Sequence, residues 1–138
     1  MNWLGWALLS AAFAGLTAVL AKAGVRDVDS NLATAIRTSV VLVLAWGIAL
    51  VGRSPSVTTV PRSAWLFLTL SGLATGASWL CYFRALAVGN ASKVAPVDKL
   101  SVVVAMVLAA LFLGEELTPA HWLGGALIVT GTVVIARA

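Results

Sequence analysis

Charged residues are scarce in this sequence. Only 10% of its 138 residues are charged, 61% are hydrophobic, and the mean hydropathy is +1.02. Soluble domains contain about 25% charged residues, so this chain has too little charge to cover a water-exposed surface. The composition excludes a soluble enzyme, a disordered chain and a nucleic-acid-binding module, although the pI is about 10.0. It predicts an integral membrane protein surrounded by membrane lipid.

Residues that carry chemistry are also few. Cys81 is the single cysteine, which excludes an internal disulfide and a cysteine-based metal site. The sequence contains no phosphate-binding loop, metal-ligand set or nucleophile triad. We therefore expect no enzymatic activity, no metal, no cofactor and no nucleic-acid partner. Glu115, Glu116 and His121 are interpreted as solvated residues of a loop.

Long apolar runs dominate what the sequence does contain. A membrane-spanning helix needs about 20 apolar residues, and the runs here are too long and continuous for strands of an outer-membrane barrel. We predict an all-α integral membrane protein with a single transmembrane domain over residues 1–138. Its five helices are expected at about residues 3–21, 32–51, 64–88, 94–113 and 119–136. So few helices cannot enclose a wide aqueous pathway alone, which suggests an oligomer.

The arrangement of Lys and Arg predicts an orientation. Five spans place the termini on opposite sides of the membrane. One side would have Arg53 and Arg62 as its basic residues. The other side would have a larger basic set, namely Lys22, Arg26, Arg84, Lys93 and Arg137, with Arg37 and Lys99 embedded near it. The positive-inside rule then places the N-terminus outside and the C-terminus in the cytoplasm. The bias shrinks without the embedded residues, so dual topology stays open.

Several charges are expected at a similar depth near the cytoplasmic side. Arg37 and Asp98 each lie about 9 Å along their helices from the predicted starts. Arg84, Lys99 and Lys22 fall near the same level. Charge in lipid is costly, which favours a paired or wet location. Two interpretations follow: a polar floor or gate of a substrate pathway, or a structural ion-pair network with Arg and Lys chains reaching the interface.

Segments three and four contain further candidates. Ser71, Thr75, Trp79 and Tyr82 follow helical spacing and would line a pocket with an aromatic floor, or the two aromatic residues would be interfacial anchors. Pro96 either starts the fourth helix or breaks it and exposes carbonyl groups beside Asp98. Small residues predict close helix packing or a dimer contact, at Gly72, Gly76, Gly124 and Gly131.

These motifs together resemble one family. Residues 71–86 (SGLATGASWLCYFRAL) are similar to the third-helix signature of an EamA-type repeat of the drug/metabolite transporter superfamily. Residues 91–104 (ASKVAPVDKLSVVV) are similar to the start of its fourth helix. Residues 113–118 (LGEELT), followed by Gly124 and Gly131, resemble its closing pattern. The likeness covers nearly the whole chain and is strongest to the five-helix, single-repeat members.

The resemblance implies one half of a ten-helix transporter fold built from two inverted repeats. A homodimer, in an inverted arrangement, would supply the whole. It implies a secondary transporter or exporter of small solutes or metabolites in the cell inner membrane, working by alternating access. The expected cavity or gate residues are Trp79, Tyr82, Arg84, Asp98 and Lys99, then Lys22 and Arg37. The alternative is a non-transporting membrane scaffold or accessory subunit. No substrate is implied, and the first-helix glutamate of the related four-helix multidrug exporters is missing.

Overall fold

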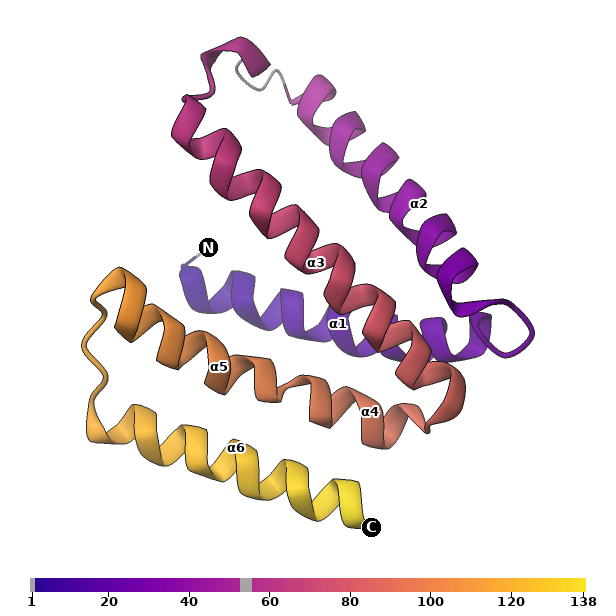
Figure 1. Cartoon of the computed structure of the whole chain (residues 1–138), viewed down its shortest axis with the longest axis vertical. Coiled ribbons are helices and arrows are strands. Elements are labelled where there is room, and N and C mark those ends of the chain that lie inside the picture. The colour runs from indigo at the N-terminus through magenta and orange to yellow at the C-terminus, as the bar shows by residue number, and fades with distance from the viewer. Residues whose placement is uncertain (1, 53–55) are drawn as a thin grey trace. The chain divides into compact units, whose positions relative to one another are not determined.

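The computed structural model describes residues 2–52 and 56–138. Every regular element within these ranges is helical, and five helical segments are long and apolar enough to cross a membrane (Figure 1). The elements are α1 (Trp3–Gly24), α2 (Ser30–Val51), η1 (Val57–Thr59), α3 (Arg62–Val88), α4 (Ala91–Asp98), α5 (Leu100–Leu108), η2 (Ala109–Leu113) and α6 (Pro119–Arg137). The predicted all-α membrane fold is confirmed.

The helix ends follow local sequence signals. Asp29 caps α2, since its side chain accepts hydrogen bonds from the backbone N–H groups of Asn31 and Leu32. Pro119 occupies the first turn of α6, where its missing N–H costs nothing. His121 completes a capping box, because its Nδ1 accepts from the backbone N–H of Thr118 at 3.1 Å. The expectation that His121 is a loop residue is therefore wrong, because His121 lies within the first turn of α6 and its side chain caps that turn.

Segment four differs from a simple helix. The helix begins at Ala91, so Pro96 lies inside α4 rather than at its start. α4 ends at Asp98, and α5 begins at Leu100 after an interruption at Lys99. The backbone N–H of Lys99 donates to the carbonyl of Pro96 at 3.0 Å, three residues back. This tighter turn replaces the regular α-helical pattern at the interruption.

The far end of the same span is also irregular. η2 is a π-helical turn, and Gly114 follows it with a φ of 68°. Glycine adopts this left-handed conformation without steric cost, so it closes the helix where other residues would be strained. The backbone N–H of Glu115 donates to the carbonyl of Ala109 at 3.3 Å. The span Ala91–Leu113 is therefore one membrane-crossing segment built from three helical pieces.

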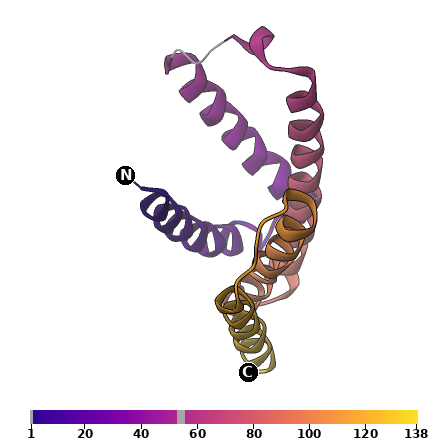
Figure 2. The ribbon, with the colours of Figure 1, turned by 90° about the vertical axis from the view of Figure 1, so that its left-hand side faces the viewer.

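The chain divides into two compact units. The α2–α3 unit comprises Ala23–Ala87, and the α4–α6 unit comprises Met1–Lys22 with Val88–Ala138. In the α2–α3 unit, the two long helices run antiparallel, converge near the start of α2 and separate toward the loop that holds η1 (Figures 1 and 2). In the α4–α6 unit, α6 packs against α4 and α5.

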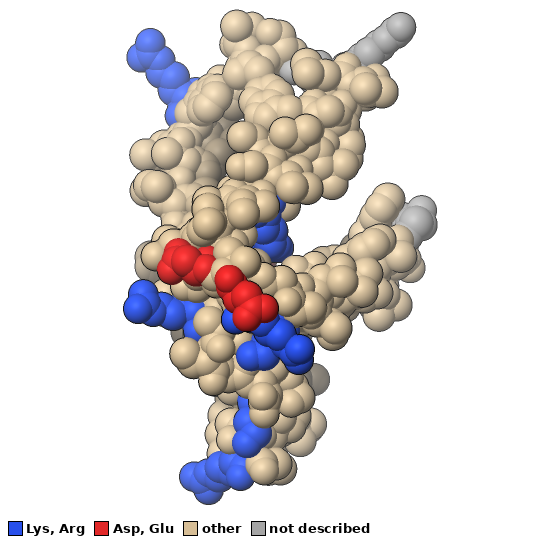
Figure 3. All heavy atoms as spheres, turned by 90° about the vertical axis from the view of Figure 1, so that its right-hand side faces the viewer, with Lys and Arg blue, Asp and Glu red and all other residues tan. Residues whose placement is uncertain are grey.

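Apolar side chains are mostly exposed along all five spans. Much of the surface in Figure 3 is neither basic nor acidic. Among the described residues, the buried apolar side chains are Ala18, Val25, Phe83 and Leu86. An apolar surface of this extent suits lipid or other helices as surroundings, because lipid needs no polar covering. The protein is a multi-pass membrane protein.

Candidate functional site

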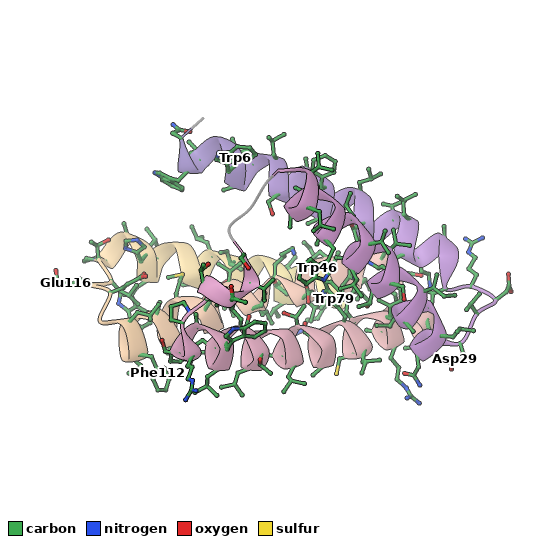
Figure 4. All side chains as sticks on the ribbon, turned by 90° about the horizontal axis from the view of Figure 1, so that it is seen from above. Trp6, Asp29, Trp46, Trp79, Phe112 and Glu116 are labelled. Atoms are coloured by element: carbon green, nitrogen blue, oxygen red, sulfur yellow. The ribbon has the colours of Figure 1, made fainter. Side chains whose placement is uncertain are left out.

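Arg37 lies against aromatic rings of the neighbouring helix in the α2–α3 unit. Its guanidinium carbon is 4.2 Å from the centroid of the Trp79 ring and 5.6 Å from that of Phe83. Figure 4 labels Trp79. Both distances are within the range of cation–π attraction. Trp79 and Phe83 are four residues apart on α3, so they present their rings on one helix face. The contact therefore joins α2 to α3 through one cation and two rings.

The surroundings of Arg37 offer it no acid. It lies seven positions after Ser30, which is about 10 Å along α2 from the start of the helix. Residues 23–87 contain only Asp27 and Asp29 as acids, and Asp29 accepts its bonds from the first turn of α2. Among the described residues, no ion pair to Arg37 is present. Its positive charge is thus balanced by ring faces rather than by a carboxylate.

Hydroxyl groups on the same stretch of α2 donate to the helix backbone. Thr34, which is 5% exposed, donates to the carbonyl of Ser30 at 2.8 Å, and Thr38 donates to the carbonyl of Thr34 at 2.7 Å. Ser39 donates to the carbonyl of Ala35 at 3.0 Å. Hydroxyl groups in helices commonly bond the preceding turn in this way. These bonds keep the hydroxyl hydrogens on the α2 backbone.

The other residues of the predicted aromatic pocket differ in burial, and the pocket itself stays a prediction. Trp79 and Tyr82 are half-buried, whereas Ser71 and Thr75 are exposed. Thr75 donates its hydroxyl hydrogen to the carbonyl of Ser71 at 2.9 Å, within α3. The ring of Tyr82 meets that of Phe83 edge-on, with centroids 6.4 Å apart. Phe83 is 3% exposed and stands at the centre of these contacts.

A second polar feature lies at the interruption of segment four. The ammonium nitrogen of Lys99 is 3.5 Å from a carboxylate oxygen of Asp98. The two side chains are 54% and 35% exposed, so water screens their attraction and the pair adds little stability. The hydroxyl of Thr132 on α6 donates to the carbonyl of Pro96 at 3.4 Å. Thr132 is 6% exposed, so α6 supports the broken segment from its buried side.

The structure places the remaining sequence candidates as follows. Arg84 is exposed on α3 and Lys22 is half-buried near the end of α1. Arg37 and Arg84 belong to one unit, and Lys22, Asp98 and Lys99 to the other. The common layer of charge therefore stays a prediction. Arg53, used in the orientation argument, lies outside the described residues.

The four candidate packing glycines have free space around them. A Cβ atom built at any of them would meet no atom within 4 Å, and this holds for Gly72, Gly76, Gly124 and Gly131. Gly125 differs, since its Cβ would lie 3.7 Å from Met106 and 3.9 Å from Val103. The α6 face that packs on α5 is thus the one with Gly125. The role of the other four glycines in a dimer stays a prediction.

Two residues in these sites escaped sequence reasoning. Phe83 was visible only as part of an apolar run, although its four-residue spacing from Trp79 places both on one face. Thr132 follows Gly131 and reads as an ordinary helix residue, because a hydroxyl bonded to another helix leaves no local pattern. Among the described residues, no group of three His, Cys, Asp or Glu could hold a metal ion.

Comparison with known proteins gives a consistent picture. The sequence model of the EamA-like transporter family matches residues 1–137. A Sinorhizobium protein described as an "uncharacterized transporter in cobO 3'region" is 54% identical over 136 residues, which cover 98% of this chain and 96% of the relative. No solved structure matches the chain.

Proposed function

Since the chain belongs to the EamA-like transporter family, we propose that it is a secondary transporter of small solutes. The family is one of transporters and not of enzymes, in line with the lack of a catalytic constellation in the sequence. We further propose that two copies form a homodimer in the inner membrane, and that the dimer works by alternating access. One chain then supplies one half of the transport pathway.

The observation that carries the proposal is the interruption of segment four. Pro96, Asp98 and Lys99 occur together in a span whose helix stops and restarts. Transporters place such breaks where carbonyl groups and charges act on the solute or on a coupling ion. A scaffold helix gains nothing from a break, because each interrupted turn loses regular hydrogen bonds. The break therefore favours transport over a purely structural role.

Substitution of Asp98 separates transport from the scaffold alternative. In Asp98→Asn the negative charge is lost at nearly constant size. For a transporter, we expect flux into proteoliposomes to fall while the amount of folded protein in the membrane is unchanged, because the exposed pair with Lys99 contributes little stability. Loss of folded protein in proportion to loss of flux would instead support the scaffold. Arg137→Gln, at the end of α6, is the matched charge control.

The arrangement of the dimer has its own test. The exposed native Cys81 is first replaced by serine. A single cysteine is then introduced as Asp27→Cys or Thr58→Cys, at positions that are expected on opposite sides of the membrane. A membrane-impermeant maleimide added to intact cells should label part of the protein at each position if the dimer is inverted. Labelling of one position alone would exclude the inverted homodimer.

A further inference from the structure

We propose that Arg37, Trp79 and Phe83 form a recognition site for an oxyanion, such as the carboxylate of an organic acid, on the transported solute. The proposal rests on the proposed transport function and names the chemical class of its substrate. All three residues belong to the α2–α3 unit.

The guanidinium group of Arg37 meets the rings of α3 rather than an acid. Its carbon lies over the Trp79 ring, 4.2 Å from the ring centroid, and 5.6 Å from the centroid of the Phe83 ring. A guanidinium group carries five N–H donors, and attraction to a ring supplies no oxygen acceptor for them. Among the described residues, no ion pair joins Arg37 to a carboxylate. Its N–H donors are therefore suited to the oxygens of an anion.

The charges of the chain leave Arg37 without an acidic partner. Asp98, the single acid within a membrane-spanning helix, pairs with its neighbour Lys99, and Asp29 caps α2. The whole chain has 9 Lys and Arg against 5 Asp and Glu, so acids in the chain cannot neutralise all its cations. An arginine about 10 Å inside a spanning helix without an acid is costly. An anionic solute that reaches it would remove that cost.

The geometry of Arg37 and its neighbours favours a ligand of a particular shape. The planar fork of arginine matches two oxygens of a carboxylate or phosphate and makes two parallel hydrogen bonds. Trp79 is half-buried, so part of its apolar ring surface beside Arg37 stays accessible, whereas Phe83 is buried behind the contact at 3% exposed. The site therefore fits a small amphipathic anion, with the oxyanion on Arg37 and the apolar part against the Trp79 ring.

A binding measurement in lipid-free maltoside micelles tests the site without requiring transport. The probes are a fluorinated benzoate and the matching benzamide, which share shape but differ in charge, and fluorine NMR line broadening reports their binding. We expect the full-length protein to broaden the benzoate signal and to leave the benzamide signal unchanged, relative to empty micelles. Equal broadening by both probes would overturn the proposal.

Variants then assign the binding to Arg37. Arg37→Gln should weaken benzoate binding about tenfold or more, since a charge-assisted bidentate pair is lost. Arg62→Gln removes an exposed charge at the start of α3 and should bind as the unaltered protein does. Unaltered binding by Arg37→Gln would overturn the proposal. If this variant is not monodisperse, Arg37→Lys decides in its place, because it keeps the charge but loses the fork and should bind more weakly.

The source of the oxyanion is tested in the same assay. Short-chain phosphatidylglycerol offers a lipid phosphate in place of a solute carboxylate. Binding of this lipid without any binding of benzoate would overturn the assignment to a solute. Flux measurements separate the two proposals. If the protein transports a solute but benzoate binding does not depend on Arg37, the anion site is wrong and the transport function stands. If benzoate binding depends on Arg37 but no anion is transported, the transport function is wrong.

Discussion

The two units of this protein hold their helices together in different ways. In the α2–α3 unit, long uninterrupted helices meet through one arginine and two rings, and the helices separate toward their connecting loop (Figures 1 and 2). In the α4–α6 unit, an interrupted segment packs on α6 through Gly125 and receives the hydroxyl of Thr132. The comparison suggests that interhelical packing stabilises the second unit, whereas the Arg37 contact in the first is available for function.

The largest effect is expected from crowding the α5–α6 contact. Gly125 is buried, and even its Cβ would reach ordinary contact distance from Met106 and Val103. Gly125→Leu should therefore lower the free energy of unfolding by about 1–3 kcal/mol through overpacking. Thermal unfolding of the purified protein in maltoside measures this. Gly125→Ala is the matched control and should be tolerated, because one methyl group fits at 3.7 Å. Equal stability of the two variants would refute the packing argument.

A smaller loss is expected from removing the bond between α6 and Pro96. Thr132→Val keeps the shape of the side chain and deletes the hydroxyl that donates at 3.4 Å. We expect a loss of about 0.5–1.5 kcal/mol, nearer the lower limit because the bond is long. Thr130→Val is the control on the same helix, since Thr130 donates to Ala126 within α6. The contrast between the units would weaken if both valine variants behaved alike in the same unfolding assay.

The smallest effect on stability is expected at Arg37. Arg37→Met loses a cation–π contact worth about 0.5–2 kcal/mol, but it also removes the cost of about 2.5 kcal/mol for a charge in the membrane. The removed cost equals or exceeds the lost attraction, so the melting temperature should not fall while benzoate binding is lost. A strong fall in melting temperature would show that Arg37 holds α2 to α3 and would erase the difference between the units.

Sequence reasoning located the spans well because hydropathy is a property of single residues and short windows. The predicted ranges 3–21 and 32–51 became Trp3–Gly24 and Ser30–Val51, since helices extend into polar turns that have good caps such as Asp29. The expected single helix at 94–113 became three pieces. The π-helical turn Ala109–Leu113 could not be read from its sequence, because its residues are equally suited to an α-helix.

The candidate sites show the same limit. Arg37 and Trp79 were each recognisable, as a charge within an apolar run and as an aromatic residue on a small-residue face. Their contact was not, because it depends on how α2 and α3 approach each other. Asp98 and Lys99 are neighbours in the sequence, and their pairing needed no tertiary information. Interactions between distant helices require packing that no local periodicity encodes.

The bond from Thr132 to Pro96 also has a consequence for biosynthesis. A ribosome completes α4 well before it reaches Thr132, and chains begin to fold from the N-terminal side during synthesis. Until α6 has been made and has joined α4, the Pro96 carbonyl accepts from the N–H of Lys99 but lacks the hydroxyl of Thr132. A helix made after α4 thus completes the broken segment, so a chain truncated before α6 would reach the membrane with this break unsupported.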